Sequence, residues 1–182
     1  QMVYQDPYDS INPRMTIQDI VNEPLEIHNI GTKEERRKMV VDTLRMVKLE
    51  PAEEIAKKYP HMLSGGQRQR AVIARAIVVK PEIIIADEPV SMLDVSIRAE
   101  ILELMKEIQK KNEISMIYIT HDLATAKHFA DNIVILNSGK VIETGSINKV
   151  LLNPENYYTK SLIAAISEPD PDNLYKMKEI SS

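Results

Sequence analysis

The chain has no cysteine, and this absence excludes several kinds of chemistry. None of its 182 residues can form a disulfide, a thiolate metal site or a cysteine nucleophile. No apolar run approaches the roughly 20 residues that a membrane-spanning helix requires. The first residues, QMVYQDPYDS, have neither the basic region nor the apolar core of a signal peptide. Together these absences predict a soluble protein of a reducing, cytoplasmic compartment.

The chain also lacks an excess of positive charge. It has 23 Lys and Arg residues against 27 Asp and Glu residues, a formal net charge of -4. A protein without a basic field lacks the long-range attraction that draws proteins to nucleic acid, so we expect no nucleic acid partner. With 43% hydrophobic residues, a chain of this length can bury one sizeable core, which predicts one domain or a little more.

The first residues suit the end of a β-strand and not the start of a chain. Position 1 is Gln and not Met, and Met2 to Tyr4 suit the end of a β-strand. We therefore expect a truncated beginning. The next stretch, from Gln5 to Arg14, is rich in Pro, Asp, Ser and Asn, which indicates a loop.

Helices are predicted to follow this loop. Residues 16–28 suit one helix, and Thr32 with Glu35 forms a capping-box pattern that begins a second. Pro51 suits the first turn of a short third helix, where its missing N–H costs nothing. A longer helix is predicted over 64–79, and its apolar far end is expected to be buried.

The second half of the chain alternates strands and helices. Residues 82–87 form a β-branched run, which we expect to be a strand covered on both faces. A helical pattern and a second such run, 114–120, follow it. Strand, helix and strand in this order predict an α/β fold with a parallel sheet. Later residues predict a helix over 123–130, a hairpin over 132–144, helices as far as 166, and a loose tail from 168.

The run Leu-Ser-Gly-Gly-Gln, from Leu63 to Gln67, opens the helix that is predicted over 64–79. Two adjacent glycines leave backbone N–H groups uncovered where the helix dipole is positive, and this arrangement suits an anion. The alternative is that Ser64 is an ordinary helix N-cap. The longer run Leu-Ser-Gly-Gly-Gln-Arg-Gln-Arg favours the anion site.

Two adjacent acids, Asp87 and Glu88, end the first strand of the predicted parallel pair. They lie at the carboxyl edge, where open α/β sheets bind their ligands. Because successive strand residues face different sides, we expect different roles. Asp87 suits the organisation of Mg²⁺, and Glu88 suits a base or an orienting group for an attacking water. The alternative is two solvated acids at the end of a strand.

A histidine, His121, comes just after the second strand of this pair. It is expected beside the acid pair if the two strands are neighbours, and its imidazole can hydrogen-bond a phosphate oxygen. Most single histidines have no catalytic role, and no role is assigned to the other three. Gln5, in the opening loop, suits a ligand of a metal or a water, although its type and position alone do not establish this.

The order and spacing of these residues resemble the nucleotide-binding domain of ABC transporters. The matching elements are the Q-loop, the signature, Walker B, the D-loop and the H-switch, at Gln5, Ser64–Gln67, Asp87–Glu88, Ser91–Asp94 and His121. The resemblance covers nearly the whole chain. It implies a P-loop NTPase-like parallel sheet with helices, together with a helical subdomain.

The resemblance narrows to the oligopeptide/dipeptide importer subfamily, which also includes nickel importers and some sugar importers. It rests on the segments Gln5–Thr16, Tyr59-Pro60-His61, Asn153-Pro154 and Tyr158-Thr159-Lys160. Some members have a Cys-rich metal motif in the tail, and this cysteine-free chain has none. Met62 and Met92 replace an acidic and a small residue that are common in the family, and both are expected to be tolerated.

One element of the family pattern is missing from this sequence. The Walker A loop requires G-x-x-x-x-G-K-[ST], and none of the five glycines begins or ends such a run. The chain alone is therefore expected to be inactive.

The resemblance also implies a division of the chain and roles for its residues. The expected regions are a Q-loop region over 1–15, a helical subdomain with the signature over 16–80, a RecA-like core over 81–145 and a C-terminal extension over 146–182. The implied cofactors are ATP and Mg²⁺. The implied catalytic residues are Glu88, His121 and Gln5; the implied Mg²⁺ ligands are Asp87 and Gln5; and the implied nucleotide contacts are Ser64, Gly65, Gly66, Gln67 and Asp94.

Partners follow from the same resemblance. Two such domains pair head to tail, with ATP between the Walker A loop of one and the signature of the other. The implied partners are a second ABC ATPase subunit, identical or paralogous, membrane permease subunits contacted through residues 7–25, and indirectly an extracytoplasmic solute-binding protein. The implied location is the cytoplasmic face of the cell membrane. The transported solute is not specified, because selectivity lies in the permease and the binding protein.

Three functions remain open on the sequence alone. The first is the C-terminal portion of an importer ATPase that couples ATP hydrolysis to the uptake of peptides or a related solute. The second is a non-catalytic module that offers only its signature to a complete partner. The third is a soluble, non-transport ABC ATPase that acts on ribosomes or DNA, and the importer-like loop and tail argue against it.

Overall fold

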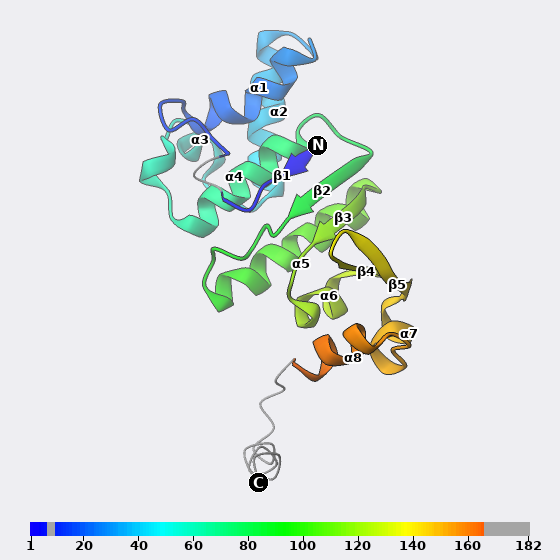
Figure 1. The fold of residues 1–182 in the computed structure, drawn as a ribbon. Coiled ribbons are helices and arrows are strands. Elements are labelled where there is room, and N and C mark those ends of the chain that lie inside the picture. The colour runs from blue at the N-terminus through cyan, green and yellow to red at the C-terminus, as the bar shows by residue number, and fades with distance from the viewer. Residues whose placement is uncertain (7–9, 166–182) are drawn as a thin grey trace. The chain divides into compact units, whose positions relative to one another are not determined.

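The computed structural model describes residues 1–6 and 10–165. They form two compact units, and the boundary in the sequence lies between Thr120 and His121. Figure 1 labels the helices and strands of both units. Within the described ranges, no helix combines the length and the apolar character that crossing a bilayer would require.

A three-stranded parallel sheet lies in the first unit. Its strands are β1 (Met2–Val3), β2 (Ile83–Asp87) and β3 (Ser115–Ile119), in the order β1-β2-β3. Ile85 pairs with Met2 on one side and with Ile117 on the other. The predicted parallel pairing of the strands at 82–87 and 114–120 is therefore confirmed.

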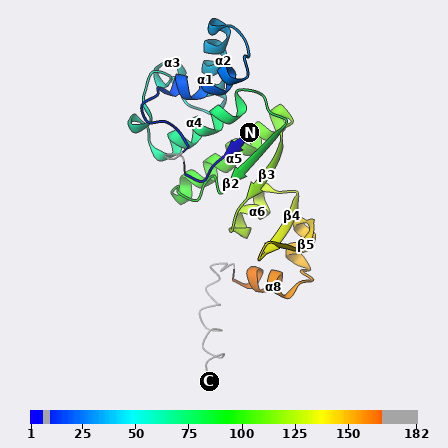
Figure 2. The same cartoon turned by 45° about the horizontal axis from the view of Figure 1, so that its top comes forward.

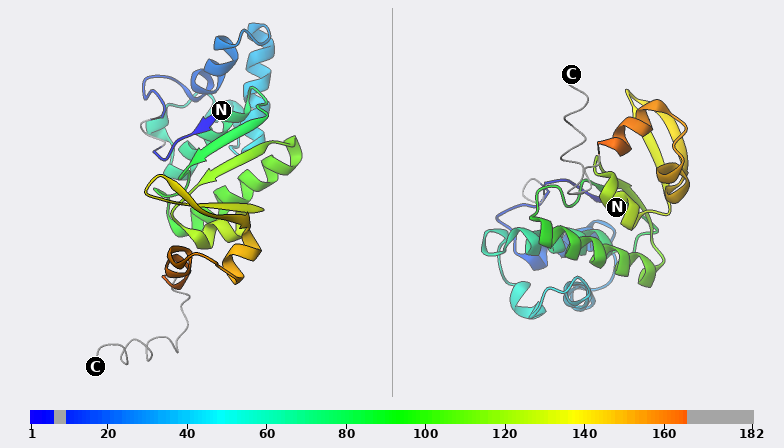
Figure 3. Two further views of the ribbon diagram at one scale, coloured as in Figure 1. Left: turned by 45° about the vertical axis from the view of Figure 1, so that its right-hand side comes forward. Right: turned by 90° about the horizontal axis from the view of Figure 1, so that it is seen from below.

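Two long helices cover one face of this sheet. They are α4 (Gly65–Ile77) and α5 (Val95–Asn112), and Figure 3 (left) shows both behind the strands. Val3, Ile84 and Ala86 point to this side and are buried. The apolar half of α4 is buried as its sequence predicts, apart from Arg75, which pairs with Glu23 at 2.7 Å.

The opposite face of the sheet is open in this chain. Ile83, Ile117 and Ile119 are exposed to 51%, 54% and 47%. The prediction that the strand at 82–87 is covered on both faces is therefore wrong for this chain. Side chains alternate across a strand, and the helices of the unit pack against only one of its two sides.

A helical subdomain packs against α4 in the same unit. It contains α1 (Ile17–Ile27), α2 (Lys33–Met46), α3 (Ala52–Ile55) and the short 3-10 helix η1 (Pro60–Met62), and Figure 2 shows them together at one end of the unit. The predicted capping box is confirmed, because the Thr32 side chain accepts from the Glu35 amide and Glu35 accepts from the Thr32 amide. Pro51 is the N-cap of α3 rather than part of its first turn.

The second unit is built around a β-hairpin. Its elements are α6 (Leu123–Phe129), β4 (Asn132–Asn137), β5 (Lys140–Ser146), α7 (Ile147–Leu152) and α8 (Tyr157–Ala164). β4 and β5 are antiparallel, and the turn residues Ser138 and Gly139 both have positive φ, at 51° and 76°. Such a turn matches the twist of the strands, and the predicted hairpin is confirmed. The predicted helix end at residue 166, the loose tail from 168 and part of the opening loop, residues 7–9, lie outside the described residues.

Candidate functional site

Gln5 and Glu88 meet at the carboxyl edge of the sheet. Gln5 Nε2 donates a hydrogen bond of 3.1 Å to Glu88 Oε2. The contact forms because Gln5 follows β1, Glu88 follows β2, and these strands are parallel neighbours. An amide that donates to a carboxylate makes a charge-assisted bond and orients the acceptor. The fold thus brings together two of the three residues for which a catalytic role is predicted.

Asp87 is the last residue of β2 and is half-buried. By the alternation of side chains it shares the open face of the sheet with Ile83 and Ile85, whereas Glu88 follows the strand. Different roles for the two acids remain a prediction. In the described part of the chain, no group of three or more His, Cys, Asp or Glu residues is arranged to hold a metal ion.

The backbone of Glu88 is in the left-handed region, with a φ of 42°. Its N–H donates to the Ile119 carbonyl over 2.9 Å, and its carbonyl accepts from the Ser91 N–H at 3.2 Å and from the Ser91 hydroxyl at 3.1 Å. A left-handed non-glycine residue costs about 1–2 kcal/mol and is common at functional sites. Nothing in the residue type Glu signals this conformation.

Ser64 caps α4 by a reciprocal pair of bonds. Its hydroxyl accepts from the Gln67 N–H at 3.3 Å, and Gln67 Oε1 accepts from the Ser64 N–H at 3.1 Å. The N-cap interpretation of Ser64 is therefore confirmed. The amides of Gly65 and Gly66 lie in the first turn, where a helix has no intrahelical acceptor. The anion site at this turn remains a prediction that these amides permit.

Gly66 has a packing role that the sequence does not reveal. A Cβ at this position would lie 2.7 Å from Ile97 Cγ2 in α5, closer than real Cβ contacts. At Gly65 a Cβ would lie 3.6 Å from Leu93 Cδ2, which is an ordinary contact. The start of α4 thus lies directly against the D-loop and the start of α5, whose N-cap is Asp94.

His121 is the first residue of the second unit, and the next residue, Asp122, is the N-cap of α6. Asp122 Oδ1 accepts from the amides of Ala124 at 3.0 Å and Thr125 at 3.3 Å. Burial acts to raise the pKa of the Asp122 carboxyl, but Thr125, the Ala124 amide and the neighbouring His121 together lower it. An approach of His121 to Glu88 remains a prediction.

Two residues of the site were missed by sequence reasoning. The sequence indicates Ser91 only as part of the D-loop, and it assigns no role to Arg98. Both hold the loop between β2 and α5 by hydrogen bonds. The only available signal was the place of Arg98, one turn into the helix that begins after Asp94.

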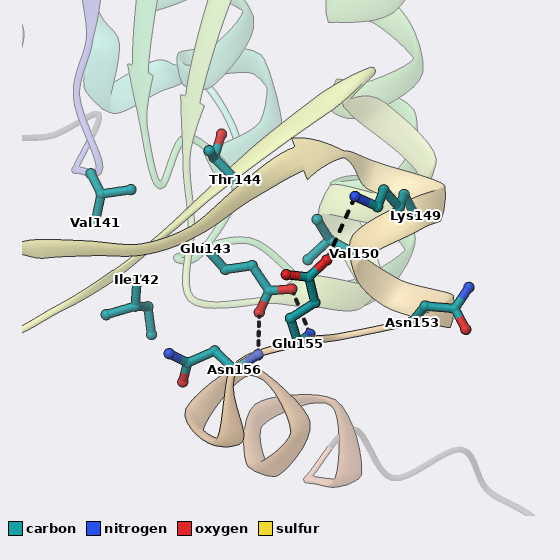
Figure 4. Close-up of a pocket in the computed structure, with 9 residues that line it drawn as sticks. All are labelled: Val141, Ile142, Glu143, Thr144, Lys149, Val150, Asn153, Glu155 and Asn156. Carbon is teal, nitrogen blue, oxygen red and sulfur yellow. Dashed lines mark hydrogen bonds and ion pairs between the residues drawn. The ribbon is translucent and has the colours of Figure 1, made fainter.

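The second unit has an open pocket of about 600 Å³, shown in Figure 4. None of the residues with a predicted nucleotide role lines it. The Glu143 carboxylate accepts from the backbone N–H groups of Glu155 at 2.8 Å and Asn156 at 3.1 Å, and Lys149 pairs with Glu155 at 3.6 Å. These bonds connect β5 to the residues that precede α8. We therefore assign the residues of this pocket a structural role.

The hydrogen bonds of the Glu143 carboxylate predict that the thermal stability of the chain depends on pH. The Thr159 hydroxyl and the amides of Glu155 and Asn156 lower the pKa of the Glu143 carboxyl below its usual value of 4.5. A carboxyl with a lowered native pKa stabilises the folded state above its unfolded pKa, and this contribution is lost as pH falls through the native pKa. We expect Glu143→Gln to lower the melting temperature at pH 7, and the difference from the parent to shrink as pH falls below 4.5 and to vanish only below the native pKa.

Thermal unfolding of both proteins between pH 3 and pH 7, followed by circular dichroism, measures this difference. Glu155→Gln is the matched control, because the Glu155 side chain is 80% exposed and forms a surface ion pair with Lys149. An equal melting temperature for the parent and Glu143→Gln at pH 7 would contradict the account.

Comparison with known proteins places these features in context. The family model of the ABC transporter matches residues 1–91. The oligopeptide transport ATP-binding protein OppF of Bacillus subtilis (strain 168) is 50% identical over 173 residues, which cover 94% of this chain and 56% of that protein. The dipeptide transport ATP-binding protein DppF of Lactococcus lactis is 45% identical over 172 residues, which cover 94% of this chain and 54% of that protein.

A solved structure agrees in fold. The dimeric, post-hydrolysis structure of the ATP-binding cassette MJ0796, bound to ADP and Pi, matches with a TM-score of 0.67 and 33% identity over 81% of this chain and 63% of that one. The present chain spans about half the length of the curated relatives that it matches.

Proposed function

Since the chain belongs to the ABC transporter family, we propose that it acts within the ATP-hydrolysing subunit of an importer that couples ATP hydrolysis to the uptake of peptides or a related solute. The observation that carries the proposal is the hydrogen bond from Gln5 to Glu88, beside Asp87 at the carboxyl edge of the sheet. The transport names of the oligopeptide and dipeptide relatives support the solute class.

In this proposal Glu88 orients the water that attacks the γ-phosphate of ATP. Phosphoryl transfer depends almost entirely on positioning and on electrostatic stabilisation. Gln5 orients the Glu88 carboxylate by donating to its Oε2, and this carboxylate would accept a hydrogen bond from the water. His121 would donate a hydrogen bond to a phosphate oxygen.

The residues at this edge fit a Mg²⁺ ion that arrives with the nucleotide. Mg²⁺ prefers oxygen ligands and is usually held by one or two carboxylates together with phosphates and water. Asp87 would supply a carboxylate, and the amide oxygen of Gln5 remains for a ligand while its Nε2 holds Glu88. When bound, the ion would neutralise charge on the phosphates.

The signature helix would serve a different nucleotide. We propose that the amides of Gly65 and Gly66, with Ser64, Gln67 and Asp94, contact ATP held by a second ABC subunit. First-turn amides without intrahelical acceptors, at the positive end of the 13-residue helix α4, support an anionic ligand. The similar MJ0796 cassette is dimeric in its structure with ADP and Pi, which is consistent with this pairing.

The proposed importer function implies the remaining partners. We propose that the subunit lies at the cytoplasmic face of the cell membrane, docks on permease subunits through residues 7–25 and works indirectly with an extracytoplasmic solute-binding protein. Residues 10–25 of this segment pack against α4 through α1 and through Arg75, which bonds Glu23 and the Ser10 carbonyl. A force on the segment would therefore reach the signature helix.

A second candidate is a non-catalytic module that offers its signature to a complete partner. It is favoured by one observation, a fully capped signature helix in a sequence that has no Walker A pattern. The mass of the protein isolated from its source distinguishes the two. A native mass near 20.7 kDa would support the module, and a larger mass would support the hydrolysing subunit.

The isolated chain provides the test of the hydrolysing function. Residues 1–182 alone should show weak ATP binding and no saturable release of phosphate, because the backbone cradle that positions the phosphates is absent. The native protein, meaning the polypeptide as its source cell makes it together with its partner subunits, should hydrolyse ATP with saturation. Calorimetric titration with ATP and a phosphate-release assay measure both. Micromolar affinity for ATP in the isolated chain would contradict the proposal.

A further inference from the structure

One arginine of α5 holds the loop that joins the acid pair to this helix. Arg98 Nε donates to the Leu93 carbonyl at 2.8 Å, and Arg98 Nη2 donates to the Ser91 carbonyl at 3.1 Å. The side chain is partly buried, and its guanidinium bonds two carbonyls with a rigid fork. Bonds from a charged donor are shorter and stronger than neutral ones.

Arg98 is connected to Glu88 through Ser91. Ser91, whose carbonyl Arg98 holds, donates both its N–H and its hydroxyl to the Glu88 carbonyl. Glu88 is in a left-handed conformation, which a non-glycine residue keeps only where its surroundings fix it. The direction in which the Glu88 side chain leaves the backbone is therefore set by the peptide that Ser91 holds.

The second bond of Arg98 reaches the signature helix. Leu93, whose carbonyl accepts from Arg98 Nε, is buried, and its side chain lies against Gly65. The same guanidinium thus fixes a residue beside Glu88 and a residue beside the signature.

Helix stability does not explain an arginine at this position. Arg98 follows the N-cap Asp94 by four residues, so its charge lies near the positive end of the helix dipole, where a cation is unfavourable. The bonds to the loop carbonyls of Leu93 and Ser91 offset this cost.

We propose that Arg98 is a positioning residue for ATP hydrolysis, which acts on Glu88 through Ser91. The proposal rests on the proposed function, because it assumes that Glu88 orients the attacking water.

Steady-state kinetics of the native protein test this role. Arg98→Met should lower kcat by about 10–100-fold, the scale of a small misplacement of a catalytic group. The KM for ATP should stay within about twofold, because the guanidinium of Arg98 bonds the carbonyls of Leu93 and Ser91 and is assigned no contact with the nucleotide. Arg98→Lys keeps the charge but replaces the planar guanidinium fork by a single ammonium nitrogen, so its kcat should be intermediate. Arg45→Met is the control, since Arg45 pairs with Asp42 and Glu53 in the helical subdomain, and its kcat should equal that of the parent.

A double variant separates positioning from a general loss of structure. If Arg98 acts through Glu88, Glu88→Gln combined with Arg98→Met should have the kcat of Glu88→Gln alone, whereas independent effects would multiply. Amide exchange in residues 1–182 gives a readout without activity. The Ser91 amide should exchange about tenfold faster in Arg98→Met and at the parent rate in Arg45→Met.

The outcomes distinguish the inference from the function on which it rests. Multiplied effects, or a kcat of Arg98→Met within about twofold of the parent, would overturn the role of Arg98 while leaving Glu88 in place. A Ser91 amide that exchanges at the parent rate in Arg98→Met would also overturn it. Unchanged turnover in Glu88→Gln itself would instead remove the proposed function of Glu88.

Discussion

Glu88→Gln should leave ATP binding by the native protein intact and lower steady-state hydrolysis by about 10²–10⁴-fold. The amide of the new side chain has the size of the carboxylate, and its oxygen can still accept from Gln5 Nε2. It carries no negative charge and cannot take a proton from water, so the step that it removes is chemical. Nucleotide binding by calorimetry and phosphate release at saturating ATP give the two quantities.

The matched control is Glu82→Gln, the same substitution just before β2, at the opposite end of the same strand. Glu82 is exposed, and its backbone carbonyl accepts from the Ser115 N–H whichever side chain is present. Its turnover should equal that of the parent. Equal turnover in Glu88→Gln and the parent would remove Glu88 from the role assigned to it.

Gly66→Ala should destabilise the first unit by about 1–3 kcal/mol, the usual cost of overpacking. The new Cβ would lie 2.7 Å from Ile97 Cγ2, so α4 and α5 must separate or Ile97 must leave its rotamer. A loss of this size lowers the melting temperature of a chain of this length by roughly 2–4 °C for each kcal/mol. Urea unfolding of residues 1–182, followed by circular dichroism, measures the free energy directly.

Two further variants show whether this contact is the cause. Gly65→Ala adds the same methyl one residue earlier, at 3.6 Å from Leu93, and should keep the parent stability within about 1 kcal/mol. Gly66→Ala combined with Ile97→Ala removes the opposing methyl and should be no less stable than Ile97→Ala alone. Parent stability in Gly66→Ala would show that α4 and α5 do not approach as closely as described.

Local features of this fold follow from local sequence signals. Thr32 and Glu35 cap α2 reciprocally because the groups that bond are three residues apart. Ser138 and Gly139 form the predicted turn, in which both residues have positive φ. Asp87 ends a β-branched run, so its place at the carboxyl edge of a strand could be predicted from five neighbouring residues.

Features that depend on distant parts of the chain could not be predicted in the same way. The bond from Gln5 to Glu88 joins residues 83 positions apart, and it requires that β1 and β2 be neighbours. The two faces of β2 carry similar isoleucines, so the sequence does not show that helices cover only one of them. The sequence indicates only that Gly66 supplies an uncovered backbone N–H. Its close approach to Ile97 could not be predicted, because it depends on where α5 packs.

The central claim is that the signature helix and the acid pair of one subunit act on different nucleotides. Residues 1–182 contain no cysteine, so Ser64→Cys introduces the one thiol of this part of the chain, at the start of α4. The direct measurement is disulfide formation in the native protein with Glu88→Gln, between this thiol and a single cysteine in the phosphate-binding loop of the partner subunit, followed by intact mass. We predict a cross-link between subunits that forms with ATP and not without nucleotide. A cross-link within one subunit, or one that does not depend on ATP, would contradict the account.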